Sequence, residues 1–306
     1  MTRLDVVAAG HALVDIRVVV DRFPGPDEEA EIRRETRGAG GSAVNVSIAA
    51  SKLGGKSGII AKIGFDGFGR IVYEELWESH VDLRGLRISP MDRTGFSIVT
   101  IDSTGSIAVY GYKGAAERLE PREVDEEVVR RARAVHIASL RLDTSIRIAE
   151  AARESGALVS WDPGRRLASK GLGAVERLLR MVDIVFLNEK EARLLTGEEP
   201  AKAAEIISSR GPGTVIVKMG ARGALLYESG RLSRIKPYTP PAVVDTTGAG
   251  DSFAAAALLM LVRGSSVLEA LDYASAVAAL KVSRLGSHAV PDPREVEEFL
   301  SRARAG

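Results

Sequence analysis

The chain of 306 residues is 45% hydrophobic and 27% charged, an ordinary composition for a globular protein with a large core. Its formal net charge of +1 gives no overall attraction to nucleic acid or to an anionic membrane, so we expect small-molecule partners, no nucleic acid and no membrane. The absence of cysteine excludes disulfides, thiolate metal sites and cysteine nucleophiles. No apolar run approaches the roughly 20 residues of a membrane span. The first residues lack the apolar segment of a signal peptide, so a cytoplasmic location is expected.

The first third of the chain alternates between short β segments and glycine-rich turns. We predict strands over 4–9, 13–20 and 57–63, an extended segment over 29–37, helices over 42–53 and up to Ser79, and a hairpin of 96–101 with 107–112. Both faces of this hairpin are fairly apolar, so the sheet needs cover on both sides. We expect one face to meet substrate and the other to meet a second subunit.

From Pro121 onward, helices and strands alternate. The predicted helices are 121–132, 144–155, 173–180, 189–195 and 201–210, the strands between them are 134–139, 157–162, 184–187 and 214–218, and a hairpin of 224–228 with 232–235 and helices from Ser252 and Leu268 complete the chain. This alternation predicts an α/β fold with a doubly wound, mostly parallel sheet flanked by helices, in a single domain over residues 1–306. Ligands of such sheets bind beyond the carboxyl ends of the strands, where Asp162, Asn188 and Gly220 lie.

The most informative stretch runs from Asp245 to Phe253 and leads directly into an apolar helix. Gly248 and Gly250 allow a tight turn and a close approach to a ligand, and the N–H groups of a first helical turn attract phosphate. A carboxylate at this place would repel phosphate unless it takes a proton from the attacking nucleophile, so Asp251 is a candidate general base. The simpler alternative is that Asp251 caps the helix and the glycines shape a strand-to-helix turn.

Two motifs, Gly40-Gly41 with Asn45 and the stretch from Asp245 to Phe253, make the sequence resemble the ribokinase or PfkB family of sugar and nucleoside kinases over essentially the whole chain. The resemblance implies a ribokinase-like fold with a small β-sheet lid formed by approximately residues 12–37 and 91–117. It also implies a kinase that transfers the terminal phosphoryl group of ATP and uses Mg²⁺. Lid sheets in this family often pair between subunits, so a homodimer is expected.

Several residue roles are implied by the same resemblance. Asp251 matches the catalytic base, and Gly248, Ala249 and Gly250 match the anion hole for the transferred phosphoryl group. Asn188 and Glu191 match an Asn-x-x-Glu pattern that organises Mg²⁺ and phosphate. The nucleotide side would include Asn188, Lys218, Gly220, Gly223 and Thr247, and Asp245 with Thr247 resemble positions around a monovalent cation such as K⁺.

On the acceptor side, the resemblance assigns Asp15, Gly40, Gly41 and Asn45 to the sugar hydroxyls, which a carboxylate and an amide can bind through hydrogen bonds. The family often has Asn after the Asp-Pro of a central strand. Here Gly164 follows Asp162-Pro163, which weakens any transfer of fructokinase specificity, and Asp162 stays a candidate substrate ligand.

Arginines make the same end of the molecule a candidate anion site. Arg141 and Arg166 follow two predicted strands, and bidentate arginines suit a phosphate or carboxylate carried by the substrate. A sugar phosphate such as a pentose phosphate is therefore one expected acceptor. The alternative is that these arginines are solvated residues at helix starts.

Other functions stay open at this level. A nucleoside is the alternative acceptor within the same family, and ADP is an alternative donor. Gly38 to Ala43 satisfies the GxGxxA pattern of an NAD-binding oxidoreductase, but an Arg-rich extended segment precedes it in place of the first strand of a βαβ unit. A non-catalytic sugar sensor on the same fold would be expected to lose the base, and Asp251 is present.

Overall fold

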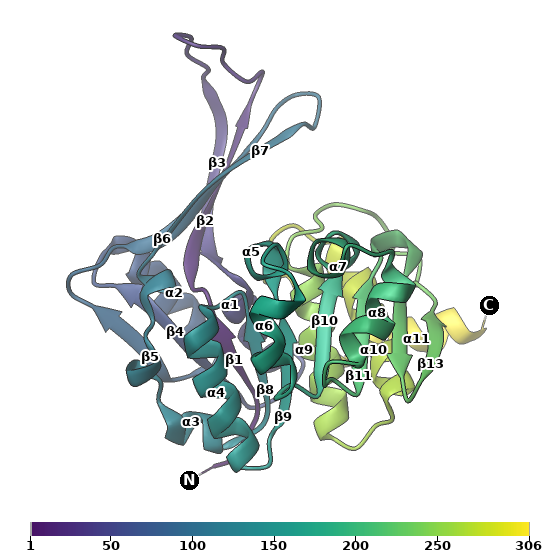
Figure 1. The fold of residues 1–306 in the computed structure, drawn as a ribbon. Helices are drawn as coiled ribbons and strands as arrows, with labels where there is room; N and C mark the ends of the chain where they lie inside the picture. Colours follow the sequence, from purple (N-terminus) through teal and green to yellow (C-terminus); the bar gives the residue numbers. More distant parts are fainter. Residues whose placement is uncertain (1, 306) are drawn as a thin grey trace.

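A nine-stranded sheet forms the centre of the computed structural model, which describes residues 2–305 (Figure 1). The strand order is β13-β12-β11-β10-β9-β8-β1-β4-β5, and all neighbours are parallel except β11-β12 and β12-β13. The bounds are β1 Leu4–Gly10, β4 Ser57–Gly64, β5 Asp82–Ser89, β8 Ala132–Ala138, β9 Leu158–Asp162, β10 Ile184–Asn188, β11 Thr214–Lys218, β12 Ala224–Glu228 and β13 Arg231–Ile235. The order reverses beside β1, and in such sheets ligands bind at this kind of switch point.

Helices cover both faces of this sheet, which confirms the predicted doubly wound arrangement (Figure 1). One face carries α1 Ser42–Lys52, α2 Gly67–Glu78, α9 Ala249–Val262, α10 Val267–Val282 and α11 Pro293–Ala305. The other carries α3 Glu126–Arg130, α4 Leu142–Glu154, α5 Gly164–Ala168, α6 Leu172–Leu179, α7 Glu189–Thr196 and α8 Pro200–Ser208. Helix α9 contacts α1, α10 and the sheet, so it is apolar on nearly all sides. No helix within residues 2–305 has both the length and the apolar character that crossing a bilayer requires.

A second sheet of four strands projects beyond the main sheet (Figure 1). Its order is β3-β2-β6-β7, with a parallel pair β2-β6 between two antiparallel pairs. The bounds are β2 Leu13–Val20, β3 Ile32–Gly40, β6 Thr94–Ile101 and β7 Ile107–Gly114. This sheet confirms the predicted lid. Strand β3 continues past the expected end at residue 37, because its pairing with β2 extends to Leu13 opposite Gly40.

A few elements differ from the sequence predictions for local reasons. The predicted helix over 121–132 is wrong. Residues Pro121–Glu123 form a 3₁₀ turn, α3 begins only after Asp125, whose side chain accepts a hydrogen bond from the N–H of Val128, and β8 already starts at Ala132. A proline and a capping aspartate so close together divide the stretch.

Three elements of the structure are absent from the sequence predictions, namely strand β5, helix α5 and helix α11. Helix α5 is too short to show a helical period.

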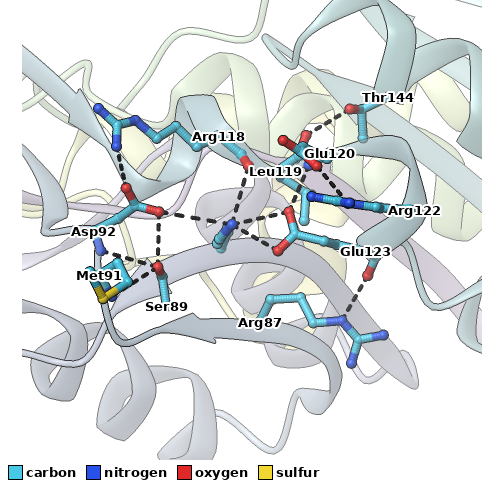
Figure 2. A network of polar contacts seen from close by, with 11 residues as sticks. Arg87, Ser89, Met91, Asp92, Arg118, Leu119, Glu120, Arg122, Glu123 and Thr144 are labelled. Atoms are coloured by element: carbon cyan, nitrogen blue, oxygen red, sulfur yellow. Dashed lines mark hydrogen bonds and ion pairs between the residues drawn. The ribbon is translucent and has the colours of Figure 1, made fainter.

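A cluster of polar side chains connects the base of the lid sheet to the main sheet (Figure 2). Lys62 on β4 donates to the two carboxylate oxygens of Glu123 at 2.7 and 3.0 Å and to the carbonyl of Arg118 at 3.3 Å. Arg118 pairs with Asp92, which also accepts from the hydroxyl of Ser89 at 2.8 Å. The Lys62 side chain is only 11% exposed, so its charge needs these partners. The cluster joins the segments on either side of β6 and β7 to one strand of the main sheet.

Candidate active site

Helix α9 begins on a glycine that no other residue could replace without strain. Gly248 has a φ of 76°, and a Cβ at this position would lie 2.8 Å from the carbonyl oxygen of Ser287. No side chain among the described residues caps this helix. The N–H of Ala249 donates to the carbonyl of Thr246 at 3.2 Å within the turn. The first-turn N–H groups that follow, beginning with Gly250, are the donors this helix start offers to an anion.

Asp251 is a partly buried carboxylate held by Asn45 on α1. The side-chain nitrogen Nδ2 of Asn45 donates to Oδ2 of Asp251 at 2.7 Å, although 206 residues separate the two in the chain. Burial raises the pKa of Asp251, while the hydrogen bond from Asn45 and the charge of Lys218 oppose that rise. A carboxylate in this setting is suited to accept a proton. The structure thus brings the two principal sequence motifs into direct contact.

Lys218, at the end of β11, places one positive charge among three carboxylates. Its Nζ lies 2.8 Å from Oδ2 of Asp162, and a Cβ on Gly250 would lie 3.2 Å from the same nitrogen. Burial disfavours the ammonium, but the carboxylates of Asp162, Glu191 and Asp251 outweigh it and raise the pKa of Lys218. Lys218 therefore carries its charge at the start of α9, where phosphate charge would also be stabilised.

Asn188 and Glu191 form a reciprocal capping arrangement at the start of α7. Asn188 accepts from the N–H of Glu191 at 2.9 Å, and Glu191 accepts from the N–H of Asn188 at 2.8 Å. Burial and the neighbouring carboxylate of Asp162 raise the pKa of Glu191 to about 7. No group of three or more His, Asp or Glu side chains able to hold a metal occurs among residues 2–305. A Mg²⁺ ion at this place would need phosphate oxygens as well as protein ligands, which is how Mg²⁺ is usually bound.

The oxygens of Asp245 are all engaged by groups of the protein itself. Its carboxylate accepts from the N–H of Thr247 and of Gly286, each at 2.9 Å, and from Arg17 on β2 at 3.2 Å. Its carbonyl accepts from Nζ of Lys281 at 2.7 Å. Lys281 is fully buried, and burial lowers its pKa. The family resemblance implies a monovalent cation at Asp245 and Thr247, and these residues do not fit one. The carbonyl oxygen of Asp245 already accepts from the ammonium group of Lys281, which takes the place of a cation there.

A cavity of 1260 Å³ lies between the lid and the loops that follow β8 and β9. Gly41 and Ser42, at the start of α1, form part of its wall, and Ser42 also hydrogen-bonds to Asp251. Two carboxylates, Glu117 and Asp143, face six cationic side chains, namely Lys113, Arg118, Arg141, Arg165, Arg166 and Lys170. The excess of positive charge favours an anionic ligand. We call this space the basic cavity.

Both arginines predicted on the acceptor side line the basic cavity, and both are paired with carboxylates. Arg141 donates from Nε and Nη2 to Asp143 at 3.0 and 2.5 Å. Arg166, with a side chain 65% exposed, pairs with Glu117. These pairs are solvent-accessible, so a substrate phosphate can replace the carboxylates at little cost.

Close backbone approach explains the two glycines of the N-terminal motif. A Cβ on Gly40 would lie 2.2 Å from Oδ2 of Asp15, and a Cβ on Gly41, whose φ is 94°, would lie 2.3 Å from the carbonyl of His11. Asp15 on β2 accepts a hydrogen bond from Ser97 on β6. The glycines therefore let the lid strand carrying Asp15 reach the start of α1.

The predicted substrate ligand Asp162 lies apart from these residues. It is held by Lys218 and is not among the described residues that line the basic cavity. The unusual Gly164 nearby has a φ of 60°, and a Cβ there would lie 2.1 Å from the hydroxyl of Ser139. The local backbone thus requires glycine where the family often has Asn.

A second cavity, of 420 Å³, is lined by Ala249 and Gly250 at the start of α9. Lys218, Gly220 and Gly223 line it as predicted for the nucleotide side, but Thr246 takes the place expected for Thr247. Most of the wall is apolar. Beside Ala249, which the anion-hole prediction includes, it comprises residues that were not predicted for the nucleotide side, namely Ala221, Ala224, Pro237, Tyr238, Pro240, Val243, Phe253, Ala278, Ala279 and Val282. An apolar slot with a few polar groups at one end suits a planar base attached to phosphates. We call it the apolar cavity.

Comparison with known proteins shows to which family the chain belongs. Residues 3–293 match the model of the pfkB family carbohydrate kinases. The chain belongs to this family. An ATP-dependent ribose-1-phosphate kinase from Halopiger xanaduensis is 37% identical over 97% of this chain and 98% of its own length. A nucleoside kinase from Methanothermobacter thermautotrophicus is 31% identical over 97% of this chain and 96% of its own.

Solved structures of ribokinases share the fold of this PfkB kinase. Arabidopsis thaliana ribokinase in complex with ribose and ATP has a TM-score of 0.89 and 29% identity over 98% of this chain and 99% of its own. A proposed ribokinase II from E. coli, in complex with ATP and Mg²⁺, has a TM-score of 0.84 and 28% identity over the same shares of the two chains. The protein is an ATP-dependent carbohydrate kinase. The oxidoreductase alternative fails because the GxGxxA segment begins within lid strand β3 and not after a strand of the main sheet.

Proposed function

We propose that this kinase transfers the terminal phosphoryl group of ATP to a hydroxyl of a phosphorylated pentose. The observation that carries the proposal is the basic cavity, whose six cationic side chains lie on the Ser42 side of Asp251. The relative from Halopiger xanaduensis that is described as a ribose-1-phosphate kinase supports the same class of acceptor. ATP would occupy the apolar cavity, on the Gly250 side of Asp251. The carboxylate would then stand between donor and acceptor.

In the proposed reaction, Asp251 is the general base. Its Oδ2 is held by Asn45, which leaves the other carboxylate oxygen to take the proton of the acceptor hydroxyl. The acceptor oxygen forms a bond to the terminal phosphorus while the bond between that phosphorus and the bridging oxygen breaks, and ADP leaves. The N–H groups of Gly250 and Asp251 and the ammonium of Lys218 would stabilise the charge on the transferred group.

Mg²⁺ would be held by the phosphates of ATP together with Glu191 and Asn188. Bound there, the ion would neutralise phosphate charge and align the terminal group. A cation bound there would favour the carboxylate form of Glu191, which burial disfavours. Asp15 on the lid, with Asn45 on α1, would bind hydroxyls of the sugar from two sides.

Arginine substitutions in the basic cavity test the class of acceptor. Arg166→Ala and Arg141→Ala are each expected to raise KM for ribose 1-phosphate by roughly 10- to 100-fold, because each removes a charge-assisted bond to the substrate phosphate. KM for ribose and for ATP should change little. Steady-state kinetics with ribose 1-phosphate and with ribose measures the two KM values. Arg177→Ala serves as the control, since Arg177 is an exposed arginine on α6 paired with Glu150. An equal effect of the cavity variants on ribose and on ribose 1-phosphate would contradict phosphate recognition.

A nucleoside is the second candidate acceptor. The relative from Methanothermobacter thermautotrophicus described as a nucleoside kinase favours it. Because a nucleoside is neutral at its ribosyl end, it would make no use of the six cations, and the same arginine variants would leave its KM unchanged.

We also propose that two copies of the kinase pair through their lid sheets. Strand β7 has large apolar side chains on both faces, and Ile107, Val109 and Tyr110 are each more than 60% exposed. Such an exposed apolar strand is typical of an interface. Light scattering after size exclusion is expected to give twice the chain mass of 32.6 kDa, and Val109→Asp should shift the protein toward the monomer. A parent protein that is monomeric at micromolar concentration would contradict the pairing.

A further inference from the structure

A chain of hydrogen bonds runs from Asp251 to the lid through groups on three other segments. Asn45 donates from Nδ2 to Asp251, and its Oδ1 lies 3.0 Å from Nε2 of His288 in the loop before α11. Nδ1 of His288 lies 2.9 Å from Oε2 of Glu75 on α2. The other oxygen of Glu75 accepts from the N–H of Ala39 on lid strand β3 at 2.7 Å. None of these contacts is local in the sequence.

The two ends of this chain fix the positions of its protons. The carboxylate of Asp251 can only accept, so Asn45 must turn its NH₂ group toward it and its carbonyl oxygen toward His288. Nε2 of His288 must therefore carry a hydrogen. Burial alone would raise the pKa of Glu75, but the bonds from His288 and from Ala39 outweigh it, so the pKa is lowered. One oxygen of Glu75 accepts from the N–H of Ala39, and the other holds the ring of His288 from its Nδ1 side.

Three charged groups act on His288 from the helices packed around it. Glu75 on α2 contacts Nδ1 of the ring directly at 2.9 Å. Lys52 on α1 donates from Nζ to the carbonyl of His288 at 2.7 Å, so it fixes the loop. Asp251 on α9 acts through Asn45. Of the three groups, only Glu75 contacts the ring itself, and the side chain of His288 is only 15% exposed, which limits screening by solvent.

We propose that His288 is a positioning residue for phosphoryl transfer, whose Nε2–H group fixes the orientation of the Asn45 amide and thereby keeps Asp251 paired with a donor. This inference rests on the proposed role of Asp251 as the base. If the amide turned over, its oxygen would face the Asp251 carboxylate and its NH₂ would face the N–H of His288. Two attractive contacts would become two repulsive ones. The reversed amide would also favour the protonated form of Asp251, which cannot act as a base.

The lid strand that anchors Glu75 also places Asp15. Ala39 is followed by Gly40, whose missing side chain leaves room for the carboxylate of Asp15. The same short segment of β3 therefore contacts Asp15 directly and Asp251 through the hydrogen-bond chain. The hydrogen-bond chain thus connects the donor of the base to this lid strand.

Variants of His288 test the inference, with ADP release from MgATP as the readout and ribose 1-phosphate and ribose assayed separately. His288→Leu is expected to lower kcat by about 10- to 100-fold, because it leaves the buried amide oxygen of Asn45 without its donor. It should also move the acid limb of the pH profile of kcat to higher pH, because Asp251 loses its ordered donor. His288→Gln keeps a donor for Asn45 and should restore most of the rate. His80→Asn, at an exposed histidine just after α2, is the control and should leave both quantities unchanged.

The outcomes separate the inference from the proposed function. If His288→Leu keeps the parent kcat, or loses activity and melting temperature together without a shift of the acid limb, the positioning role is wrong. Asp251→Asn is measured in parallel. If Asp251→Asn abolishes turnover while the profile of His288→Leu does not move, the inference fails and the proposed base stands. If Asp251→Asn remains active, the proposed function itself fails.

Discussion

Asp251→Asn is expected to lower kcat by about 10² to 10⁴-fold, the usual contribution of a general base. The substitution keeps the size of the side chain and a group that can accept from Asn45, but removes the capacity to take a proton from the acceptor hydroxyl. KM for ATP should change little, because the nucleotide would lie in the apolar cavity. Rapid-quench measurement of a single turnover checks that the chemical step is the one affected. A variant that folds and turns over at the parent rate would contradict the role of Asp251.

The same variant should fold at least as stably as the parent at pH 8. Burial raises the pKa of Asp251 above that of an unfolded aspartate, so the folded chain binds a proton more tightly than the unfolded chain does. This contribution to stability is present at low pH and is lost as pH rises through the folded-state pKa. The amide introduced by Asp251→Asn carries no charge, so the variant avoids that loss. Thermal melting at pH 8 therefore serves as the control for folding.

The second large effect is expected at Lys218. Lys218→Met should lower the free energy of unfolding by about 3 kcal/mol, because it leaves the buried carboxylates of Asp162 and Glu191 without their cation. It should also raise the pKa of Asp251 further, so that the rate at neutral pH falls and recovers in part at higher pH. Urea denaturation and the pH profile of kcat measure the two effects.

A matched lysine shows whether the effect belongs to the site. Lys202 on α8 pairs with Glu205, but both side chains are more than half exposed, so Lys202→Met should cost less than about 1 kcal/mol. Combining Lys218→Met with Asp162→Leu removes both partners and should return part of the lost stability. Equal losses for Lys202→Met and Lys218→Met would show that the carboxylates around Lys218 do not depend on it.

The sequence predicted those parts of the fold and site that depend on neighbours in the chain. The alternation after Pro121 predicts the doubly wound sheet, since each strand and helix is long enough to show its own period. The stretch from Asp245 to Phe253 carries glycines, acid and helix together, so its anion-binding geometry can be read locally. The helix predicted over 121–132 is interrupted because the side chain of Asp125 caps the start of α3. The helical spacing of apolar residues in this stretch did not show that cap.

The remaining parts of the site depend on contacts between distant segments. His288 and Asn45 are 243 residues apart, and Glu75 and His288 are 213 apart, so no pattern of spacing connects them. Lys281 occupies the carbonyl of Asp245 from the end of α10, and nothing near Lys281 in the sequence marks this role. The apolar cavity is built from separate segments of ordinary apolar residues. The role of each of these side chains depends on its burial and on its partners, and both are set only when the chain folds.

The preference for a phosphorylated acceptor is the central claim, and one measurement tests it most directly. The purified kinase is assayed for kcat/KM with MgATP and each of ribose 1-phosphate, ribose 5-phosphate, ribose, fructose and adenosine. Charge-assisted contacts in the basic cavity predict a kcat/KM for one of the pentose phosphates that exceeds every neutral acceptor by about 100-fold or more. A neutral sugar or nucleoside that is phosphorylated as efficiently as either pentose phosphate would contradict the claim.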